Sequence, residues 1–126
     1  MIHLDTSILI AMVKVADEHH PAARKLAATP HQFSTSAVAW MEFHSRPVQP
    51  TLTMALRGLL SGGIVPFDDQ TAALAGDLYH RVRSSRRTRM DVMIAATAIL
   101  AGAELATVNP NDFQAFLPHG LILCPI

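Results

Sequence analysis

The sequence contains little charge and almost no cysteine. Only 16% of its 126 residues are charged, the formal net charge is zero, and Cys124 is the single cysteine. Low charge together with 50% hydrophobic residues argues against intrinsic disorder, and a neutral total gives no global sign of nucleic-acid binding. One cysteine excludes an internal disulfide, which suits a reducing cytosol and predicts a cytoplasmic protein.

The sequence also lacks segments typical of export or membrane insertion. The first five residues contain no basic region and no cleavage site, so no secretory signal is expected. The alanine-rich stretch over residues 91–105 is too short to cross a bilayer, so no membrane partner is expected. A chain of this length and hydrophobic content fits one domain, residues 1–126, with a substantial core.

Short apolar segments alternate with helical patterns along the chain. Strands are predicted over residues 1–4, 32–34, 64–67, 105–108 and 121–123, with Pro66 favouring a sheet edge for the third. Helices are predicted over residues 8–15, 21–28, 37–45, 51–60, from about 69 to 83, and 91–101, with a turn over residues 109–112. This alternation predicts an α/β fold with a mostly parallel sheet of four to five strands and helices on both faces.

Four acidic residues are expected at one edge of this sheet. Asp5 follows the first strand, and Asp112 follows the fourth. Glu42 lies in the helix after the second strand, and Asp91 begins the helix that runs back before the fourth strand. All four positions belong to the edge formed by the carboxyl ends of the strands, where open α/β sheets bind their ligands.

Each acid also has an ordinary structural interpretation. Asp5 and Asp91 fit helix N-caps, and Asp112 fits a turn. Glu42 resists such an interpretation, because it shares an apolar helix face with Val38 and an unpartnered buried carboxylate is costly. Four carboxylates held together raise each other's pKa unless a cation joins them, and Mg²⁺ or Mn²⁺ prefers oxygen ligands. The set therefore predicts a divalent-metal centre that activates water against a phosphodiester.

Smaller polar residues accompany the acids. Thr6 and Ser7 follow Asp5 directly, and their hydroxyls suit a metal-bound water or a phosphate oxygen, although helix capping is the simpler role. Thr107 and Asn109 flank the end of the fourth strand, where they would orient Asp112 or a substrate phosphate, or serve only as ordinary strand-end residues.

Five of the chain's eight arginines fall within residues 81–89. A basic cluster of this kind fits contact with an RNA backbone, and the candidates for that contact are Arg83, Arg86, Arg87 and Arg89. Two alternatives stay open. The cluster is a solvated helix end, where basic residues are stabilising, or one arginine neutralises the neighbouring acids when metal is absent.

Taken together, four segments resemble the PIN domain. They are Leu4-Asp5-Thr6-Ser7, Ala39-Trp40-Met41-Glu42-Phe43, Asp91-Val92-Met93-Ile94-Ala95-Ala96-Thr97-Ala98 and Thr107-Val108-Asn109-Pro110-Asn111-Asp112-Phe113. The resemblance is strongest to VapC-type toxin ribonucleases of bacterial toxin–antitoxin pairs, and it spans the whole chain.

The resemblance implies a three-layer α/β/α sandwich and an endoribonuclease that depends on Mg²⁺ or Mn²⁺. It also implies a homodimer and inhibition by a small antitoxin protein. By motif position, Asp5, Glu42, Asp91 and Asp112 would bind metal, and Thr6, Ser7, Thr107 and Asn109 would be auxiliary residues of the catalytic site.

Two other functions remain open on the sequence. One is a PIN-fold module that binds RNA or protein without catalysis, against which the presence of all four acids argues. The other is a metal-dependent phosphatase with an aspartate nucleophile after the first strand. That chemistry usually needs a second aspartate two residues later, where this chain has Ser7.

Overall fold

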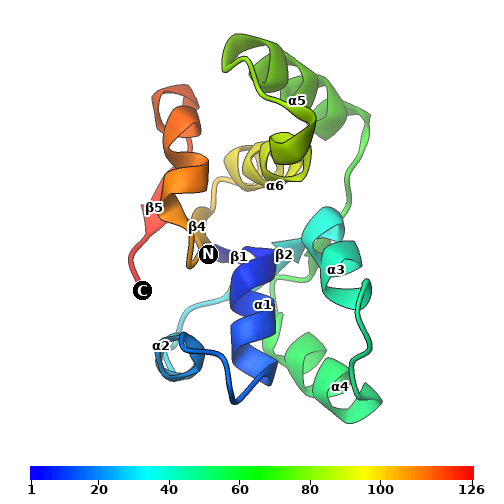
Figure 1. Ribbon diagram of the computed structural model, residues 1–126, viewed down its shortest axis with the longest axis vertical. Helices are drawn as coiled ribbons and strands as arrows, with labels where there is room; N and C mark the ends of the chain where they lie inside the picture. Colours follow the sequence, from blue (N-terminus) through cyan, green and yellow to red (C-terminus); the bar gives the residue numbers. More distant parts are fainter.

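A five-stranded parallel sheet runs through the middle of the protein (Figure 1), as described by a computed structural model of residues 1–126. Its strands are β1 (Ile2–Leu4), β2 (Phe33–Ser36), β3 (Ile64–Val65), β4 (Glu104–Ala106) and β5 (Leu123–Cys124). Every neighbouring pair is parallel, so the sheet is wholly rather than mostly parallel. The third strand lies at an edge, as Pro66 predicted.

Helices cover both faces of the sheet and complete the expected three-layer α/β/α fold (Figure 1). On one face lie α1 (Thr6–Val13), α2 (His20–Ala27) and α4 (Pro50–Leu59). On the other lie α5 (Asp69–Arg81), α6 (Arg89–Leu100) and the 3₁₀ helix η2 (Pro110–His119). Helix α3 (Ala37–His44) contacts both α1 and α6, and a short 3₁₀ turn, η1 (Arg86–Thr88), precedes α6.

The core is one cluster of 25 buried hydrophobic residues. A parallel sheet covered on both faces needs apolar strands, and the central strand β1 supplies the buried Ile2 and Leu4. Helix α6 is apolar almost all round, with Ile94, Ala95 and Ala98 fully buried, because it packs against both the sheet and α5. This packing fixes the start of α6 against the end of the sheet.

The strand order creates a crevice at one place on the sheet edge. The order is β3-β2-β1-β4-β5, so the chain moves outward from β1 in one direction through β2 and β3, and in the other through β4 and β5. In open α/β sheets the ligand crevice lies beyond the carboxyl ends of the two strands where the order reverses. Here those strands are β1 and β4, which Asp5 and Thr107 follow directly.

The last long helix begins earlier than the sequence predicts. Helix α6 starts at Arg89 and not at Asp91, and the N-cap position belongs to Thr88. Asp91 therefore lies inside the first turn, which excludes its interpretation as an N-cap. The Thr88 side chain makes no capping hydrogen bond to the helix and donates to the Ser85 carbonyl instead, so the usual signal for a helix start is missing.

The predicted turn over residues 109–112 is the beginning of the ten-residue 3₁₀ helix η2. Its buried residues Phe113 and Phe116 are three positions apart, which matches the three-residue period of a 3₁₀ helix. The helix ends at Gly120, whose φ of 104° suits glycine. The helix was not predicted, because residues 109–112 have the composition of a turn. The three-residue spacing of Phe113 and Phe116 is the signal in the sequence that indicates it.

Helix α5 ends in a Schellman motif that has arginine where glycine is usual. The Ser84 N–H donates to the Tyr79 carbonyl, and the Arg83 N–H donates to the His80 carbonyl. Arg83 has a φ of 52°, and it is the only non-glycine residue with positive φ. Such a conformation costs an ordinary residue about 1–2 kcal/mol, so this position retains arginine at the expense of stability.

We expect Arg83→Gly to raise the free energy of unfolding. The strain of about 1–2 kcal/mol is relieved, while the greater freedom of glycine in the unfolded chain takes back up to about 1 kcal/mol. Urea unfolding should therefore show a gain of about 0.5–1 kcal/mol. Arg86→Gly is the matched control, because Arg86 has negative φ and its variant should be no more stable than the wild type.

Candidate active site

The Asp5 carboxylate is buried at the end of β1 and is held by three donors. The Asp5 N–H donates to the Ala106 carbonyl of β4 at 3.0 Å, which fixes the backbone at the crevice. Oδ1 accepts from the Thr6 N–H at 2.8 Å, and Oδ2 accepts from the hydroxyls of Ser7 at 2.9 Å and Thr107 at 2.7 Å. Asp5 is also the N-cap of α1, so its capping role and its place in the crevice coexist.

Burial raises the pKa of the Asp5 carboxyl above its usual value. The hydrogen bonds from Thr107, Ser7 and Thr6 act in the opposite direction, and the negative charge of Asp112 raises the pKa further. The three donors thus oppose the rise in the pKa of Asp5 that burial causes.

Ser7 and Thr107 form a small network that positions Asp5. Their hydroxyl oxygens lie 3.3 Å apart; Ser7 Oγ accepts from the Val108 N–H at 3.2 Å, and Thr107 Oγ1 accepts from the Asn109 N–H at 3.0 Å. Asn109 enters through its backbone, and its side chain is exposed. The contribution of the Val108 N–H was not predicted, because a backbone donor leaves no mark on residue identity.

We expect Thr107→Val to destabilise the protein at neutral pH and to raise the pKa of Asp5. The variant removes a donor from a buried carboxylate, at a cost of about 1–3 kcal/mol. Thr107→Ser keeps the hydroxyl and should restore both properties. NMR titration of the Asp5 carboxyl and urea unfolding at pH 7 provide the two readouts, and a valine variant with unchanged Asp5 titration would show that this hydrogen bond has no effect on the carboxylate.

Glu42 approaches the same crevice from α3. Thr6 Oγ1 donates to Glu42 Oε1 at 2.8 Å, so Thr6 joins the end of β1 to α3. The neighbouring aromatic rings of Trp40 and Phe43 stack with centroids 5.5 Å apart and give α3 a rigid apolar side. Glu42 is half-buried beside this surface.

The pKa of Asp91 responds to the charges of the other three acids. It is half-buried in the first turn of α6, and burial is the main cause that raises its pKa to about 7. The negative charges of Asp5, Asp112 and Glu42 each raise it further. Three carboxylates from three other parts of the chain therefore act on Asp91, while Asp112 itself lies exposed in the first turn of η2.

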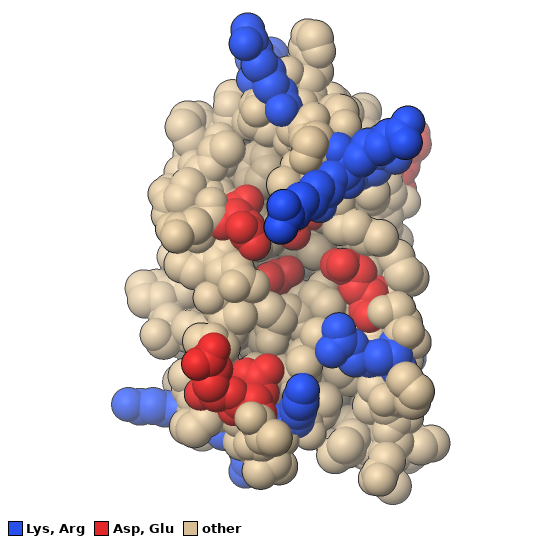
Figure 2. Space-filling model, viewed as in Figure 1, with Lys and Arg blue, Asp and Glu red and all other residues tan.

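No basic side chain neutralises this cluster. The close contacts between basic and acidic side chains join the imidazole of His19 to Glu18 and the guanidinium of Arg81 to Asp77. Figure 2 shows acidic side chains around a depression in the middle of one face, with long basic side chains across its upper rim. The idea that an arginine of residues 81–89 pairs with the acids is therefore not supported by the structure.

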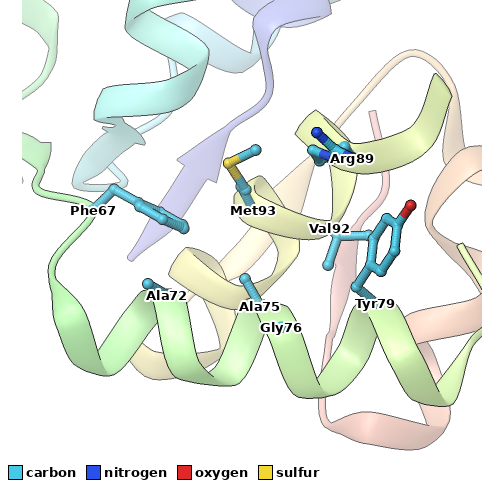
Figure 3. Close-up of a pocket in the computed structure, with 8 residues that line it drawn as sticks. All are labelled: Phe67, Ala72, Ala75, Gly76, Tyr79, Arg89, Val92 and Met93. Carbon is cyan, nitrogen blue, oxygen red and sulfur yellow. The ribbon is translucent and has the colours of Figure 1, made fainter. Parts of the chain in front are cut away.

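Arg89 packs against a separate cavity. Its guanidinium carbon lies 5.8 Å from the centre of the Tyr79 ring, a cation–π arrangement. Both residues border an apolar cavity of about 370 Å³ between α5 and α6, together with Phe67 and Met93 (Figure 3). No acidic residue lines this cavity, so it is not part of the carboxylate cluster.

The donor set suits a hard divalent cation, because it consists of carboxylate and hydroxyl oxygens. The side chains do not form a closed cage, since no three His, Cys, Asp or Glu groups converge on one point. Mg²⁺ commonly binds through one or two carboxylates and retains several waters. A separated cluster of four acids with unbalanced negative charge is compatible with such a mode.

None of the helices is long and apolar enough to cross a membrane. The PIN domain family model matches residues 2–116. Among curated proteins, none matches the sequence.

Solved structures provide further similarities. FitAcB from Neisseria gonorrhoeae is 20% identical, with a TM-score of 0.70 over 99% of this chain and 97% of that one. A toxin–antitoxin complex from Klebsiella pneumoniae is 28% identical, with a TM-score of 0.69 over 90% and 91% of the two chains. VapC20 from Mycobacterium tuberculosis, a toxin that cleaves the sarcin–ricin loop, is 18% identical, with a TM-score of 0.66 over 99% and 100%.

Proposed function

Because the chain belongs to the PIN domain family, whose members are typically nucleases, we propose that it is a metal-dependent endoribonuclease and the toxin of a toxin–antitoxin pair. The observation that carries this proposal is the charge of the crevice. Burial and the charges of three other acids raise the pKa of Asp91 to about 7, and none of the four acids forms an ion pair with a basic residue. Repulsion of this kind destabilises a fold and is typical of sites that bind a cation.

In this proposal Asp5, Glu42, Asp91 and Asp112 hold Mg²⁺ or Mn²⁺. The ion, when bound, lowers the pKa of water and stabilises charge on the phosphate. Ser7 and Thr107 hold the Asp5 carboxyl group by hydrogen bonds, and Thr6 holds Glu42 in the same way. We assign auxiliary roles to these hydroxyls and to the Asn109 backbone, which anchors Thr107.

The proposal extends to partners. The Klebsiella pneumoniae neighbour is a toxin–antitoxin complex, which supports a small antitoxin as the partner of this chain. Exposed apolar side chains, among them Met41 and Met54, support contact with another protein. We also propose a homodimer, which the resemblance to VapC-type toxins implies.

Metal-dependent cleavage of single-stranded RNA tests the proposed function. The purified protein should cut a labelled RNA with Mn²⁺ and lose this activity with a chelator. It should not hydrolyse a generic phosphate ester, because Ser7 occupies the position where a phosphatase would need a second aspartate. RNA binding without cleavage would support the binding module, and ester hydrolysis would support the phosphatase.

We propose that Arg83, Arg86, Arg87 and Arg89 contact the RNA backbone at the rim of the crevice. Arg86 and Arg87 are exposed and form no ion pair. Replacing both with glutamine should weaken RNA binding and reduce the slope of log K against log salt by about 1.4, since each phosphate contact on a single strand contributes about 0.7.

The matched control replaces Arg24 and Arg57, which are exposed on other helices, with glutamine. It makes the same change in net charge and should leave the slope close to that of the wild type. Equal slopes for the two double variants would exclude a specific role for Arg86 and Arg87.

A further inference from the structure

A second cavity, of about 440 Å³, opens on the β4–β5 side of the crevice. Its walls come from three parts of the chain: the segment after β4, strand β5 and the start of α2. They include Thr107, Val108, Pro110, Leu123, His19 and Ala22. The volume falls within the range of sites that bind small organic groups.

One side chain joins the wall of this cavity to the carboxylate cluster. Thr107 lines the cavity and also donates to Asp5 Oδ2 at 2.7 Å. A group seated in the cavity therefore lies one side chain away from the acid that we place at the centre of the reaction. The cavity is therefore near enough to Asp5 to hold a part of the substrate next to the group that reacts.

The walls favour a flat, neutral group. Val108, Pro110 and Leu123 provide apolar surfaces, and no Asp, Glu, Lys or Arg side chain lines the cavity. A phosphate would find no lysine or arginine there. The side chains with polar atoms are Thr107, whose hydroxyl is already bonded to Asp5, Cys124, whose thiol donates to the Pro125 carbonyl, and His19. The His19 ring contacts the exposed Glu18 carboxylate at 3.3 Å, and such an exposed contact can be exchanged for a bond to another group at little cost.

A nucleobase has these properties, with two apolar faces and a polar edge. Single-stranded RNA presents unstacked bases that proteins bind in such places. We propose that this cavity receives the nucleobase adjacent to the phosphate that is cleaved, with His19 contacting the base edge. The inference rests on the proposed ribonuclease function and adds a determinant of where the RNA is cut.

Filling the cavity tests the proposal. Ala22→Phe places a ring at a half-buried position of its wall, whereas Ala28→Phe adds the same bulk at an exposed position just beyond α2, outside the cavity. Each variant is assayed on an RNA with one mapped cut site, and on the same RNA with an abasic nucleotide on one or the other side of the cut.

On intact RNA, Ala22→Phe should lower kcat/KM about tenfold, as expected for the loss of one bound base. One of the two abasic RNAs should lower the wild-type value to the same degree. When Ala22→Phe is assayed on that abasic RNA, its kcat/KM should be no lower than with either change alone, because the variant and the missing base remove the same contact. Ala28→Phe should behave as the wild type, and His19→Ala should weaken the preference among the four bases at that position.

The proposal would be overturned if Ala22→Phe had the same kcat/KM as the wild type on intact RNA. It would also be overturned if Ala22→Phe on the abasic RNA lost about a hundredfold in kcat/KM relative to the wild type on intact RNA. If Ala22→Phe does not fold, His19→Ala decides the matter: an unchanged base preference contradicts the assignment.

A binding assay separates this inference from the proposed function. In the Asp5→Asn background without metal, Ala22→Phe should weaken binding of the intact RNA about tenfold by fluorescence anisotropy. A protein that cleaves no RNA but shows this loss would refute the ribonuclease and retain the base site. A protein that cleaves RNA but binds it equally well with and without Ala22→Phe would support the ribonuclease and refute the base site.

Discussion

Replacing Asp5 with asparagine should reduce metal-dependent RNA cleavage at least about 100-fold, while the protein stays folded. Loss of residues that merely support metal ligands commonly costs about 10–100-fold, and Asp5 is proposed as a ligand itself. The fold should survive, because the hydroxyls of Ser7 and Thr107 can rotate to accept hydrogen bonds from the new amide group. Cleavage rates and far-UV circular dichroism check the two parts of this expectation.

Asp68→Asn is the matched control for Asp5→Asn. Asp68 is also the N-cap of a helix, α5, and asparagine is an equally good cap. The control makes the same chemical change at a helix start outside the crevice and should retain full activity. Full activity in Asp5→Asn would instead remove this carboxylate from the proposed site.

The second large effect concerns stability in the absence of metal. The pKa of Asp91 is about 7 in the folded protein against an ordinary 3.8, so the folded state holds this proton more tightly than the unfolded state. The resulting stabilisation is fully present below pH 3.8 and is lost as the pH rises towards 7. At pH 8, ionised Asp91 therefore destabilises the metal-free protein, and Asp91→Asn should be more stable than the wild type.

The expected gain at pH 8 is about 1–2 kcal/mol. A shift of this size would correspond to about 4 kcal/mol in full, but Asp91 is only half-buried and solvent screening reduces its effect. At pH 4 the gain should nearly vanish. The measurement is the difference in unfolding free energy between variant and wild type, because burial also lowers the pKa of His3 to about 4 and destabilises both proteins in acid.

Asp77→Asn provides the contrast for Asp91→Asn. Asp77 is exposed and pairs with Arg81 at 2.9 Å, so its loss should cost a little stability or none. A stabilised Asp77 variant, or an Asp91 variant that is less stable than the wild type at pH 8, would contradict the repulsion that we infer within the crevice.

The sequence predicted the features that depend on local chemistry. The helices predicted from residue 37 and from about residue 69 begin at Ala37 and Asp69, where Ser36 and Asp68 cap them through the N–H groups of Ala39 and Thr71. The edge position of β3 followed from Pro66. In the same way, connectivity alone placed the four acids on one edge, and the structure brings them close enough to influence the pKa of Asp91.

Features that depend on tertiary contacts escaped prediction. The hydrogen bond between Thr107 and Asp5 joins residues 102 positions apart, and the bond between Thr6 and Glu42 joins residues 36 positions apart. The start of α6 escaped because Thr88 forms no side-chain cap. The direction of Arg89, towards Tyr79, depends on how α5 and α6 pack.

Calorimetric titration of the metal-free protein with Mn²⁺ tests the central claim most directly. If the four acids form a metal centre, Mn²⁺ should bind at pH 8, where Asp91 is ionised. At pH 7 and below, binding should release protons and its affinity should fall, because Asp91 must be ionised to bind. The double variant Asp5→Asn/Asp91→Asn should lose this binding. Absence of binding to the wild type at pH 8, or equal binding by the double variant, would contradict the assignment of these carboxylates to a metal centre.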